Sequence, residues 1–299
     1  SGNAGMSEIL VIGKSGQMAQ ALAHAGAADL HCAGREEADL LNANAMATAL
    51  DAHTPRIVIN TGAYTAVDKA ESEPDLCRAL NVDAPAALAK LCHERGIPLL
   101  HLSTDCVFDG EKPTPYLPQD ATSPIGVYGQ SKLDGELAVR SAAPRSLVIR
   151  VSWIFSHFGS NFVTTMLRLA ATRDEVSVVD DQYGCPTHAP ALAEALLQIA
   201  HTADRPGFGD WGAYHLAGAG ETDRASMARQ IFEASARHGG PVAKVKGIPT
   251  SAYPTPARRP LNARLDMSDT TRVFGTTLPV WTEGLEDTVR VWVRELRSS

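Results

Sequence analysis

Residues 9–19 read I-L-V-I-G-K-S-G-Q-M-A, an apolar run that ends in glycines where a helical pattern begins. A run that is apolar at every position is typical of a strand buried on both faces of a parallel sheet. Gly13, Gly16 and Ala19 follow it at three-residue spacing. Glycines at such a turn let the backbone approach a pyrophosphate at the positive N-terminus of the next helix. We therefore predict a dinucleotide-binding turn rather than a plain strand-to-helix connection.

The alternation of apolar runs and helices continues to about residue 155. An Ala-rich helical pattern runs to about Ala25, and further helical patterns and apolar runs lie at 56–60, 74–95, 98–103 and 146–151. Strands separated by helices indicate an α/β fold, a doubly wound parallel sheet of the Rossmann-like type. After Trp153 the alternation of strands and helices becomes irregular, which predicts a smaller lobe packed against the sheet. Its helical segments fall near 161–173, 189–203, 223–237 and 283–297.

These patterns divide the chain into three parts. We expect residues 1–5 to be an expression scar, because S-G-N-A-G precedes the methionine at position 6. Residues 6–155 are predicted to form the NAD(P)-binding Rossmann-like domain. Residues 156–299 are predicted to form mainly the substrate-binding lobe, with some segments returning to the Rossmann core. No flexible Gly/Ser linker separates the two parts.

Composition and charge narrow the classes of function. The 299 residues are 44% hydrophobic and 20% charged, as in a globular protein with a large core. The net charge is −7 and no Lys/Arg-rich run occurs, so we expect neither a nucleic-acid partner nor a membrane-surface partner. No apolar stretch approaches 18 residues, and the N-terminus lacks the pattern of a signal peptide.

The cysteines suggest a reducing environment. The five are Cys32, Cys77, Cys92, Cys106 and Cys185. They are odd in number and contain no C-x-x-C pair, so we expect a cytoplasmic protein without a disulfide framework or a zinc site.

Cofactor preference is encoded about twenty residues after the first glycine, where an NAD-binding chain usually places an acid on the adenosine ribose. This chain reads C-A-G-R-E-E at 32–37, with Gly34 and Arg35 at the predicted strand end. A guanidinium at that point can pair with a 2′-phosphate, so we predict a preference for NADP(H). Glu36 and Glu37 follow immediately, which leaves the use of NAD(H) open.

A candidate catalytic group lies at the carboxyl end of the run at 98–103, where ligands bind in open α/β sheets. Thr104 and Asp105 follow that run, and Tyr128 and Lys132 stand four residues apart in a later helical segment. Residues at this spacing share one helical face. An ammonium about 5–6 Å from a phenol, at an effective dielectric of about 20, would lower the phenol pKa by about two units.

We therefore expect Tyr128 to act as a general acid with Lys132 as its partner, and Thr104 to add a hydrogen bond to the substrate oxygen. The alternative for the pair alone is a solvated helix that carries an incidental tyrosine.

Seven stretches spread along the chain carry a resemblance to a known family. They are G-K-S-G-Q-M (13–18), I-N-T-G-A-Y-T-A-V-D-K-A-E-S-E-P (59–74), L-S-T-D-C-V-F-D-G (102–110), S-P-I-G-V-Y-G-Q-S-K (123–132), R-V-S-W-I-F (150–155), D-Q-Y-G-C-P-T (181–187) and R-R-P-L-N-A-R-L-D (258–266). Together they resemble the extended, nucleotide-sugar-modifying branch of the short-chain dehydrogenase/reductase superfamily. The closer similarity is to the dTDP-4-dehydrorhamnose reductase family.

The resemblance implies an NADPH-preferring oxidoreductase of nucleotide-sugar biosynthesis for cell-surface polysaccharide. The implied reaction reduces the 4-keto group of dTDP-4-dehydro-L-rhamnose to dTDP-L-rhamnose, with Tyr128 as acid, Lys132 as its partner and Thr104 as helper. The implied cofactor residues are Gly16, Gln17 and Met18 at the diphosphate, Asp39 and Leu40 at the adenine, and Ala63, Tyr64 and Thr65 at the phosphates and nicotinamide ribose.

For the substrate, the resemblance implies sugar contacts from Thr104, Asp105 and Trp153. An exposed tryptophan is a suitable platform for a sugar ring, although a core tryptophan at a strand end is the alternative. Arg259 is the candidate for the substrate diphosphate, because a guanidinium can clamp phosphate bidentately. Asn161 is a weaker candidate.

The chain departs from the family pattern at two kinds of site. Cys106 stands where the family commonly has tyrosine after S-T-D, and we expect a pocket-lining thiol rather than a nucleophile. Some members bridge subunits through Mg²⁺ held by glutamates, but the matching positions here are Ala21 and Pro190, which cannot ligate a hard cation. We predict no Mg²⁺ site, and any homodimer is expected to form without one.

Two other functions stay open from the sequence. One is another nucleotide-sugar modifier, an epimerase or dehydratase that keeps its cofactor bound. The other is a non-catalytic NADP-binding regulatory subunit. The nucleotide of the substrate, dTDP or UDP, is also left open.

Overall fold

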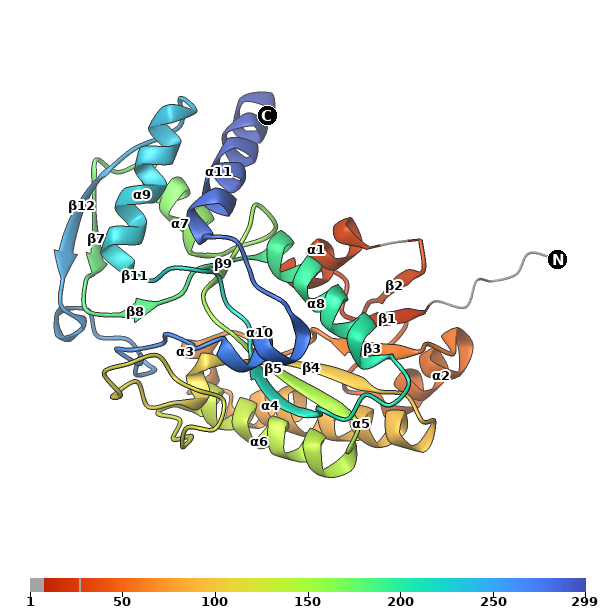
Figure 1. The fold of residues 1–299 in the computed structure, drawn as a ribbon. Coiled ribbons are helices and arrows are strands. Elements are labelled where there is room, and N and C mark those ends of the chain that lie inside the picture. The colour runs from red at the N-terminus through yellow and green to blue at the C-terminus, as the bar shows by residue number, and fades with distance from the viewer. Residues whose placement is uncertain (1–7, 27) are drawn as a thin grey trace.

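A six-stranded sheet forms the centre of the molecule in the computed structural model, which describes residues 8–26 and 28–299 (Figure 1). Its strands are β1 (Ile9–Ile12), β2 (Leu30–Ala33), β3 (Ile57–Asn60), β4 (Leu99–Thr104), β5 (Ser146–Val151) and β10 (Gly212–His215). The order is β10-β5-β4-β3-β1-β2, and every neighbouring pair is parallel. Because β1 lies between β2 and β3, the winding reverses there and creates a topological switch point.

Both faces of this sheet are covered, as the apolar runs predicted. Val11 and Ile59 pack on one face with α1 (Gln17–Ala25) and α8 (Ala189–Ala203). Their neighbours Leu10 and Val58 pack on the other face. The helices there are α2 (Ala43–His53), α5 (Ala84–Glu94) and α6 (Val127–Ala142). The predicted doubly wound α/β fold is confirmed, whereas the proposed scar at 1–5 lies outside the described residues.

The helix predicted over 74–95 is present but carries an insertion. A π-helical segment (Ala79–Asp83) separates α4 (Pro74–Arg78) from α5, and the short α3 (Val67–Ala70) precedes them. Such π segments are frequent at functional sites. Here the segment presents Asn81, whose side chain accepts from the Tyr64 N–H (2.8 Å) and donates to the Tyr64 carbonyl (3.0 Å). The loop after β3 is thereby held in place.

The second half of the chain builds a lobe beside the sheet, at the left of Figure 1. It contains α7 (Phe162–Ala170), α9 (Arg224–Arg237), α11 (Trp281–Ser298) and the parallel pair β7 (Glu175–Val179) and β12 (Lys244–Ile248). Their apolar faces form a separate core. The four helical segments predicted after Trp153 are therefore confirmed as α7, α8, α9 and α11.

Short paired strands join the lobe to the sheet. β6 (Ile154–Phe155) pairs with β9 (Thr187–His188), and β8 (Tyr183–Gly184) pairs with β11 (Thr222–Asp223). Three later segments return to the sheet side: α8, β10 and α10 (Ser268–Phe274). The division at 155/156 itself stays a prediction. Within residues 8–26 and 28–299, no helix is both long and apolar enough to span a bilayer.

Candidate active site

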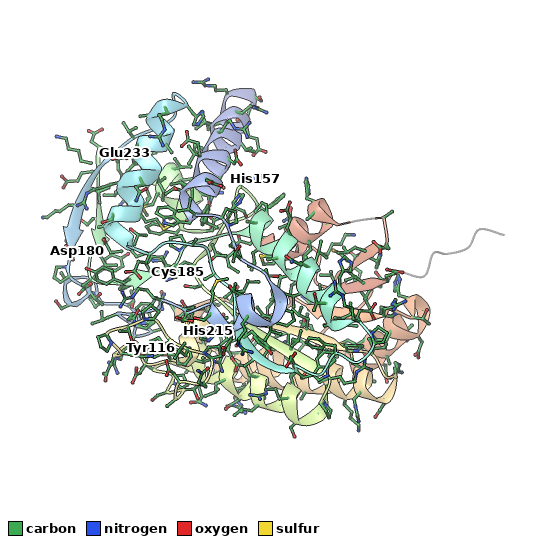
Figure 2. All side chains as sticks on the ribbon, in the orientation of Figure 1. Tyr116, His157, Asp180, Cys185, His215 and Glu233 are labelled. Carbon is green, nitrogen blue, oxygen red and sulfur yellow. The ribbon has the colours of Figure 1, made fainter. Side chains whose placement is uncertain are left out.

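A cavity of about 510 Å³ opens at the carboxyl ends of β4 and β5, between the sheet and the lobe. Its wall includes residues of the sheet side and of the lobe: Val67, Asp68, Asp105, Cys106, Trp153, Phe162, Met166, Ser177, Val178, Val179, Gln182, Arg224, Tyr253, Thr255, Arg259, Pro260 and Ala263. Figure 2 shows Cys185 at this junction, between the lobe residues Asp180 and Glu233 and the sheet residue His215. The cavity therefore lies where the fold predicts a ligand.

The proposed acid, Tyr128, lies in the first turn of α6 beside Thr104 at the end of β4. A β-carbon on Gly129 would stand 2.3 Å from the Cys106 carbonyl oxygen, so glycine allows α6 to lie directly against the turn after β4. Burial raises the pKa of the Tyr128 phenol and the charges of Cys106 and Asp105 add to this, while a hydrogen bond with the Thr104 hydroxyl acts in the opposite direction.

The expectation that Lys132 lowers the Tyr128 pKa is wrong in this structure. Lys132 is 4% exposed, and its Nζ donates to the Leu102 carbonyl at 2.8 Å. Burial lowers the pKa of Lys132 to about 8, against the opposing charge of Glu136. Burial therefore dominates both members of the pair, and the phenol is kept protonated.

A buried ion pair between Glu136 and Arg150 joins α6 to the sheet. The Glu136 carboxylate on α6 receives Arg150 Nη2 at 2.8 Å and Arg150 Nε at 3.0 Å, and also the Ser103 hydroxyl. The other side of Arg150 meets His215 Nε2 at 3.3 Å. Burial, with the Arg150 charge adding to it, lowers the pKa of His215 to about 3. Neighbouring strands β4, β5 and β10 are thus tied to α6 by polar contacts.

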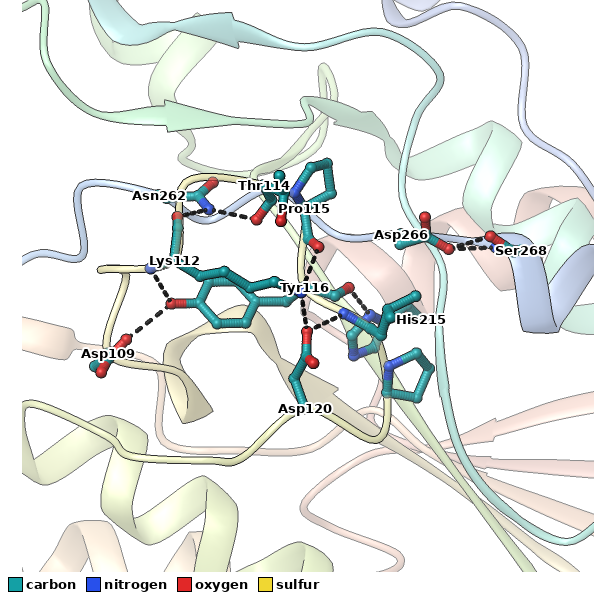
Figure 3. A network of polar contacts seen from close by, with 12 residues as sticks. Asp109, Lys112, Thr114, Pro115, Tyr116, Asp120, His215, Asn262, Asp266 and Ser268 are labelled. Atoms are coloured by element: carbon teal, nitrogen blue, oxygen red, sulfur yellow. Dashed lines mark hydrogen bonds and ion pairs between the residues drawn. The ribbon is translucent and has the colours of Figure 1, made fainter.

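The network continues into the loop at 109–120 (Figure 3). His215 Nδ1 lies 2.9 Å from the Tyr116 carbonyl, and the Tyr116 hydroxyl donates to Asp109 at 2.8 Å. Asn262 donates to the carbonyls of Lys112 (2.7 Å) and Thr114 (2.9 Å). The loop is therefore anchored to the R-R-P-L-N-A-R-L-D stretch, which carries Arg259.

The glycine turn after β1 fits a dinucleotide diphosphate. Gly13 has φ +122°, and a β-carbon there would lie 2.4 Å from Thr61 Oγ1. A β-carbon on Gly16 would meet no atom within 4 Å, so the N-terminus of α1 faces open space. No side chain caps this helix, which leaves its first N–H groups for an anion.

The side chains of the two residues after Gly16 are both engaged within the protein. Gln17 Oε1 accepts from the Ser156 hydroxyl at 2.8 Å, so its side chain joins α1 to the loop after β6. The Met18 side chain is buried beneath the turn. Any contact of these two residues with a diphosphate would therefore come from their backbone N–H groups.

The adenosine side of the turn carries two cations. Arg35 is 85% exposed, with its Nε 3.9 Å from Asp39 Oδ2. The Lys14 side chain packs against Gly34, where a β-carbon would come within 3.1 Å of Lys14 Cβ. Sequence reasoning missed Lys14, although its place inside the G-x-x-G turn was a usable signal. Asp39 also accepts from the backbone N–H of Leu41 at 2.9 Å.

Leu40, in the loop after β2, and residues 63–65, in the loop after β3, lie at the same edge of the sheet. Leu40 Cδ1 would lie 2.5 Å from a β-carbon on Gly62, so the two loops are in contact. The Tyr64 hydroxyl donates to Glu73 at 2.8 Å, and burial together with Glu73 raises the Tyr64 pKa to about 12. Because the Tyr64 hydroxyl is already bonded to Glu73, the flanking Ala63 and the exposed Thr65 are better placed to contact a cofactor.

Trp153 does not offer the open platform that the sequence suggested. The Arg224 guanidinium stacks over its ring at 3.7 Å from the centroid. A β-carbon on Gly184 would lie 2.4 Å from Trp153 Cε2, so the backbone at Gly184 covers the ring as well. Two groups this close to one ring centre must lie on opposite faces. Only the edge of the ring is left for a ligand, and the Trp153 backbone has φ +45°.

Arg224 is the functional candidate that sequence reasoning missed. It is the first residue of α9, where the helix dipole disfavours a cation. That misplaced charge was the available signal. The pKa of Arg224 is lowered to about 10 by burial, with the charge of Arg259 acting in the same direction and the charge of Asp105 opposing it. Arg224 therefore belongs to the charged wall of the cavity together with Asp105 and Arg259.

Arg259 has a guanidinium nitrogen without a hydrogen-bond partner. Its Nη1 lies 3.1 Å from Asp68 Oδ1, but the angle is not that of a hydrogen bond, so this buried atom has no hydrogen-bond partner. An orphaned guanidinium N–H at the wall of a cavity fits an anionic ligand.

Asn161 serves the fold instead. Its side chain caps α7, accepting from Val163 and Thr164 and donating to the Ser156 carbonyl at 2.7 Å. It does not line the cavity.

Asp105 and Cys106 complete the sheet side of the cavity. Asp105 accepts from the Ser152 hydroxyl at 2.9 Å, and burial raises its pKa. The Cys106 thiol lies 3.4 Å from Asp105 Oδ1; burial and the neighbouring carboxylate raise its pKa, which suits a lining group rather than a nucleophile. Ala21, the residue at one family Mg²⁺ position, is buried in the core between α1 and α8.

The chain is similar to known proteins along nearly its whole length. A protein named dTDP-4-dehydrorhamnose reductase from Sinorhizobium fredii is 45% identical over 278 residues, covering 92% of this chain and 94% of the relative. The protein of the same name from Escherichia coli is 40% identical over 288 residues, with coverage of 93% and 95%.

Solved structures agree with these sequence relatives. A crystal structure of dTDP-4-dehydrorhamnose reductase from Bacillus anthracis in complex with NADP superimposes with a TM-score of 0.87 at 30% identity, covering 94% of this chain and 97% of that one. A family model described as the RmlD substrate binding domain matches residues 6–293. The chain therefore belongs to the RmlD substrate binding domain family, in agreement with the resemblance to dTDP-4-dehydrorhamnose reductases.

Proposed function

We propose that the protein reduces the 4-keto group of dTDP-4-dehydro-L-rhamnose to dTDP-L-rhamnose, with NADPH as the preferred reductant. The relatives with this name match more than nine tenths of the chain, and one of them was solved with NADP. The observation that carries the proposal is the placement of Tyr128 beside Thr104 at the carboxyl end of β4, next to a cavity that has an orphaned Arg259 Nη1.

The chain supplies the proton and the charge balance of the reaction. NADPH, when bound, supplies the hydride that reduces the keto carbon. Tyr128 donates its hydroxyl proton to the carbonyl oxygen as that carbon is reduced, and the oxygen becomes the new hydroxyl group. The Thr104 hydroxyl donates to Asp105 Oδ1 at 3.1 Å in the structure, and with substrate bound it would turn this proton to the same carbonyl oxygen of the substrate. The Lys132 ammonium stabilises the phenolate, which then recovers a proton from solvent.

The raised pKa of Tyr128 suits this direction of proton transfer. A phenol that titrates well above neutrality is fully protonated before each turnover, so the acid is always loaded. Proton donation leaves a buried phenolate, which is the unfavourable state. The nearby Lys132 ammonium stabilises that phenolate.

The cofactor residues fall into three groups along the sheet edge. The N–H groups after Gly16 hold the diphosphate, and Lys14 and Arg35 bind the 2′-phosphate that distinguishes NADPH from NADH. Asp39 and Leu40 border the adenine. The backbone at 63–65, fixed by Asn81, borders the nicotinamide ribose.

The substrate enters with its diphosphate toward the cationic wall. Arg259 and Arg224 bind the phosphates, because both guanidinium groups line the cavity. Asp105 accepts from a sugar hydroxyl, and Trp153 contacts the sugar through its ring edge. We place the reaction in the cytoplasm and expect any homodimer to form without Mg²⁺.

The test is absorbance at 340 nm with NADPH and then NADH, in the presence of dTDP-4-dehydro-L-rhamnose generated enzymatically in place. We expect decay that requires the sugar nucleotide and is faster with NADPH. Stoichiometric consumption of NADPH would argue against an epimerase or dehydratase, which regenerates its cofactor. Protein that binds NADPH but oxidises none of it would overturn the proposal in favour of another keto sugar or a regulatory subunit.

A further inference from the structure

A cluster of ligand-type side chains lies at the free edge of the sheet, away from the cavity. His31 is on β2, Glu37 is in the turn after it, and His53 is the last residue of α2. His31 Nε2 lies 2.7 Å from Glu37 Oε2, and His53 Nε2 lies 2.6 Å from Glu37 Oε1. In the described part of the chain, no other group of three or more His, Cys, Asp or Glu side chains brings all its ligand atoms within 4.8 Å of one another.

We propose that His31, Glu37 and His53 bind a divalent transition-metal ion of the Zn²⁺ type. Two imidazole nitrogens and one carboxylate oxygen form a donor set that Zn²⁺ accepts, with water in the fourth position. None of these three residues lines the cavity.

The imidazoles are arranged in the form that binds metal. Their rings stack with centroids 4.3 Å apart and an interplanar angle of 21°, and both Nε2 atoms are directed at the same carboxylate. A neutral imidazole is the ligand form, and metal binding would replace the hydrogen-bonded protons at Nε2.

A small movement converts the hydrogen-bonded cluster into a coordination site. With metal–ligand bonds of about 2.0–2.2 Å, donors in a tetrahedral site stand about 3.3 Å apart. The carboxylate would therefore retreat by roughly 0.7 Å from its hydrogen-bonding distance. Glu37 is 37% exposed and has room to move, and the exposure of His31 (39%) gives the ion an entry path.

The two histidines are held by regular structure. His31 pairs with Leu10 in the β1–β2 register, and His53 ends α2 just before Thr54, whose N–H bonds to the Leu50 carbonyl. Ligands on such elements keep their spacing better than ligands on loops. An ion there would join the edge strand to α2 and fix the turn that follows β2.

The experiment uses the full chain without a histidine tag. Zn²⁺ binding is measured by calorimetry, and Co²⁺ binding by visible absorption, for wild type, Glu37→Gln, His53→Gln and the control His93→Gln on the exposed face of α5. We expect one ion per chain in wild type and in the control. A change outside the ligand set already costs about 10- to 100-fold in affinity, so each ligand variant should lose at least that much.

The variants also separate metal binding from simple hydrogen bonding. Glutamine at position 53 can still donate to Glu37 but is a poor ligand for Zn²⁺, so His53→Gln should fold normally and lose the rise in Tm that Zn²⁺ causes in wild type. Zn²⁺ affinity equal in wild type and both ligand variants would overturn the proposal. So would the absence of binding in wild type, which would leave two histidines hydrogen-bonded to one carboxylate.

Discussion

The two ends of the cavity differ in whether their charged side chains are hydrogen-bonded within the protein. At the reaction end, Lys132 is bonded to the Leu102 carbonyl and α6 is held by the Glu136–Arg150 pair. At the recognition end, Arg224 is stacked on an aromatic ring, and Arg259 keeps a buried N–H without a hydrogen-bond partner. Polar groups that are hydrogen-bonded inside the chain fix the geometry of the site, whereas a donor without a hydrogen-bond partner is available to a ligand.

The origin of each end explains this difference. The reaction end is built from β4, β5 and α6, which share backbone contacts and a buried network. The recognition end combines the strand end at Trp153, the first residue of α9 and the loop before residue 262. Substitutions at the reaction end should therefore change turnover or stability, and those at the recognition end should change affinity.

The largest effect is expected from Tyr128→Phe, which keeps the ring and removes the proton. Loss of a general acid should lower kcat by about 10²- to 10⁴-fold while NADPH binding is retained. The measurements are NADPH oxidation and NADPH fluorescence titration. Tyr214→Phe is the control, because its hydroxyl bonds to the Asp210 carbonyl away from the cavity. A kcat within about tenfold of wild type would remove Tyr128 from the role of acid.

Next in size is the effect of Glu136→Gln on stability. The substitution leaves Arg150, which is 5% exposed, without its buried counter-ion. We expect the free energy of unfolding to fall by about 3–5 kcal/mol, measured by urea denaturation. Asp134→Asn on the same helix breaks an exposed pair with Arg78 and should cost no more than about 1 kcal/mol. Equal losses in the two variants would contradict the assignment of Glu136 as a buried support.

Arg224→Gln tests the recognition end. A hydrogen bond to a charged group contributes about 1.5–3 kcal/mol, so the KM for the sugar nucleotide should rise by about 10- to 100-fold with little change in kcat. The affinity for dTDP should fall by a similar factor. Thymidine, which lacks phosphate, should bind wild type and variant alike. If thymidine affinity falls as much as dTDP affinity, Arg224 supports Trp153 rather than binding phosphate.

The smallest effect is a pH dependence from Lys132. Its folded pKa of about 8 lies below its ordinary value of 10.5, so the unfolded chain binds more protons between these two values. The contribution of Lys132 to stability should therefore increase from about pH 8 to 10.5. Activity that needs the ammonium should decrease over the first part of the same range.

The measurement for Lys132 compares wild type with Lys132→Met. Unfolding free energies at pH 7.5 and pH 10 should differ less in the variant, because the shifted group is absent. The alkaline decrease in kcat/KM is followed in wild type alone. The same pH dependence of stability in both proteins would show that Lys132 titrates normally.

The sequence determined the parts of this protein that depend on local order along the chain. Apolar runs separated by helices were enough for a doubly wound sheet, because both faces of each strand are buried. The glycine turn after β1 and the four-residue spacing of Tyr128 and Lys132 predicted a cofactor turn and a catalytic helix, since residues four apart share one face of a helix.

Only the tertiary structure decided the properties that depend on burial and on contacts between distant segments. It reversed the expected pKa shift of Tyr128, because burial, with the charges of Cys106 and Asp105, raises that pKa. It covered Trp153 with Arg224 and Gly184, and it brought His31, Glu37 and His53 to one point. Desolvation and packing are set by all neighbours in space, and spacing along the chain does not contain that information.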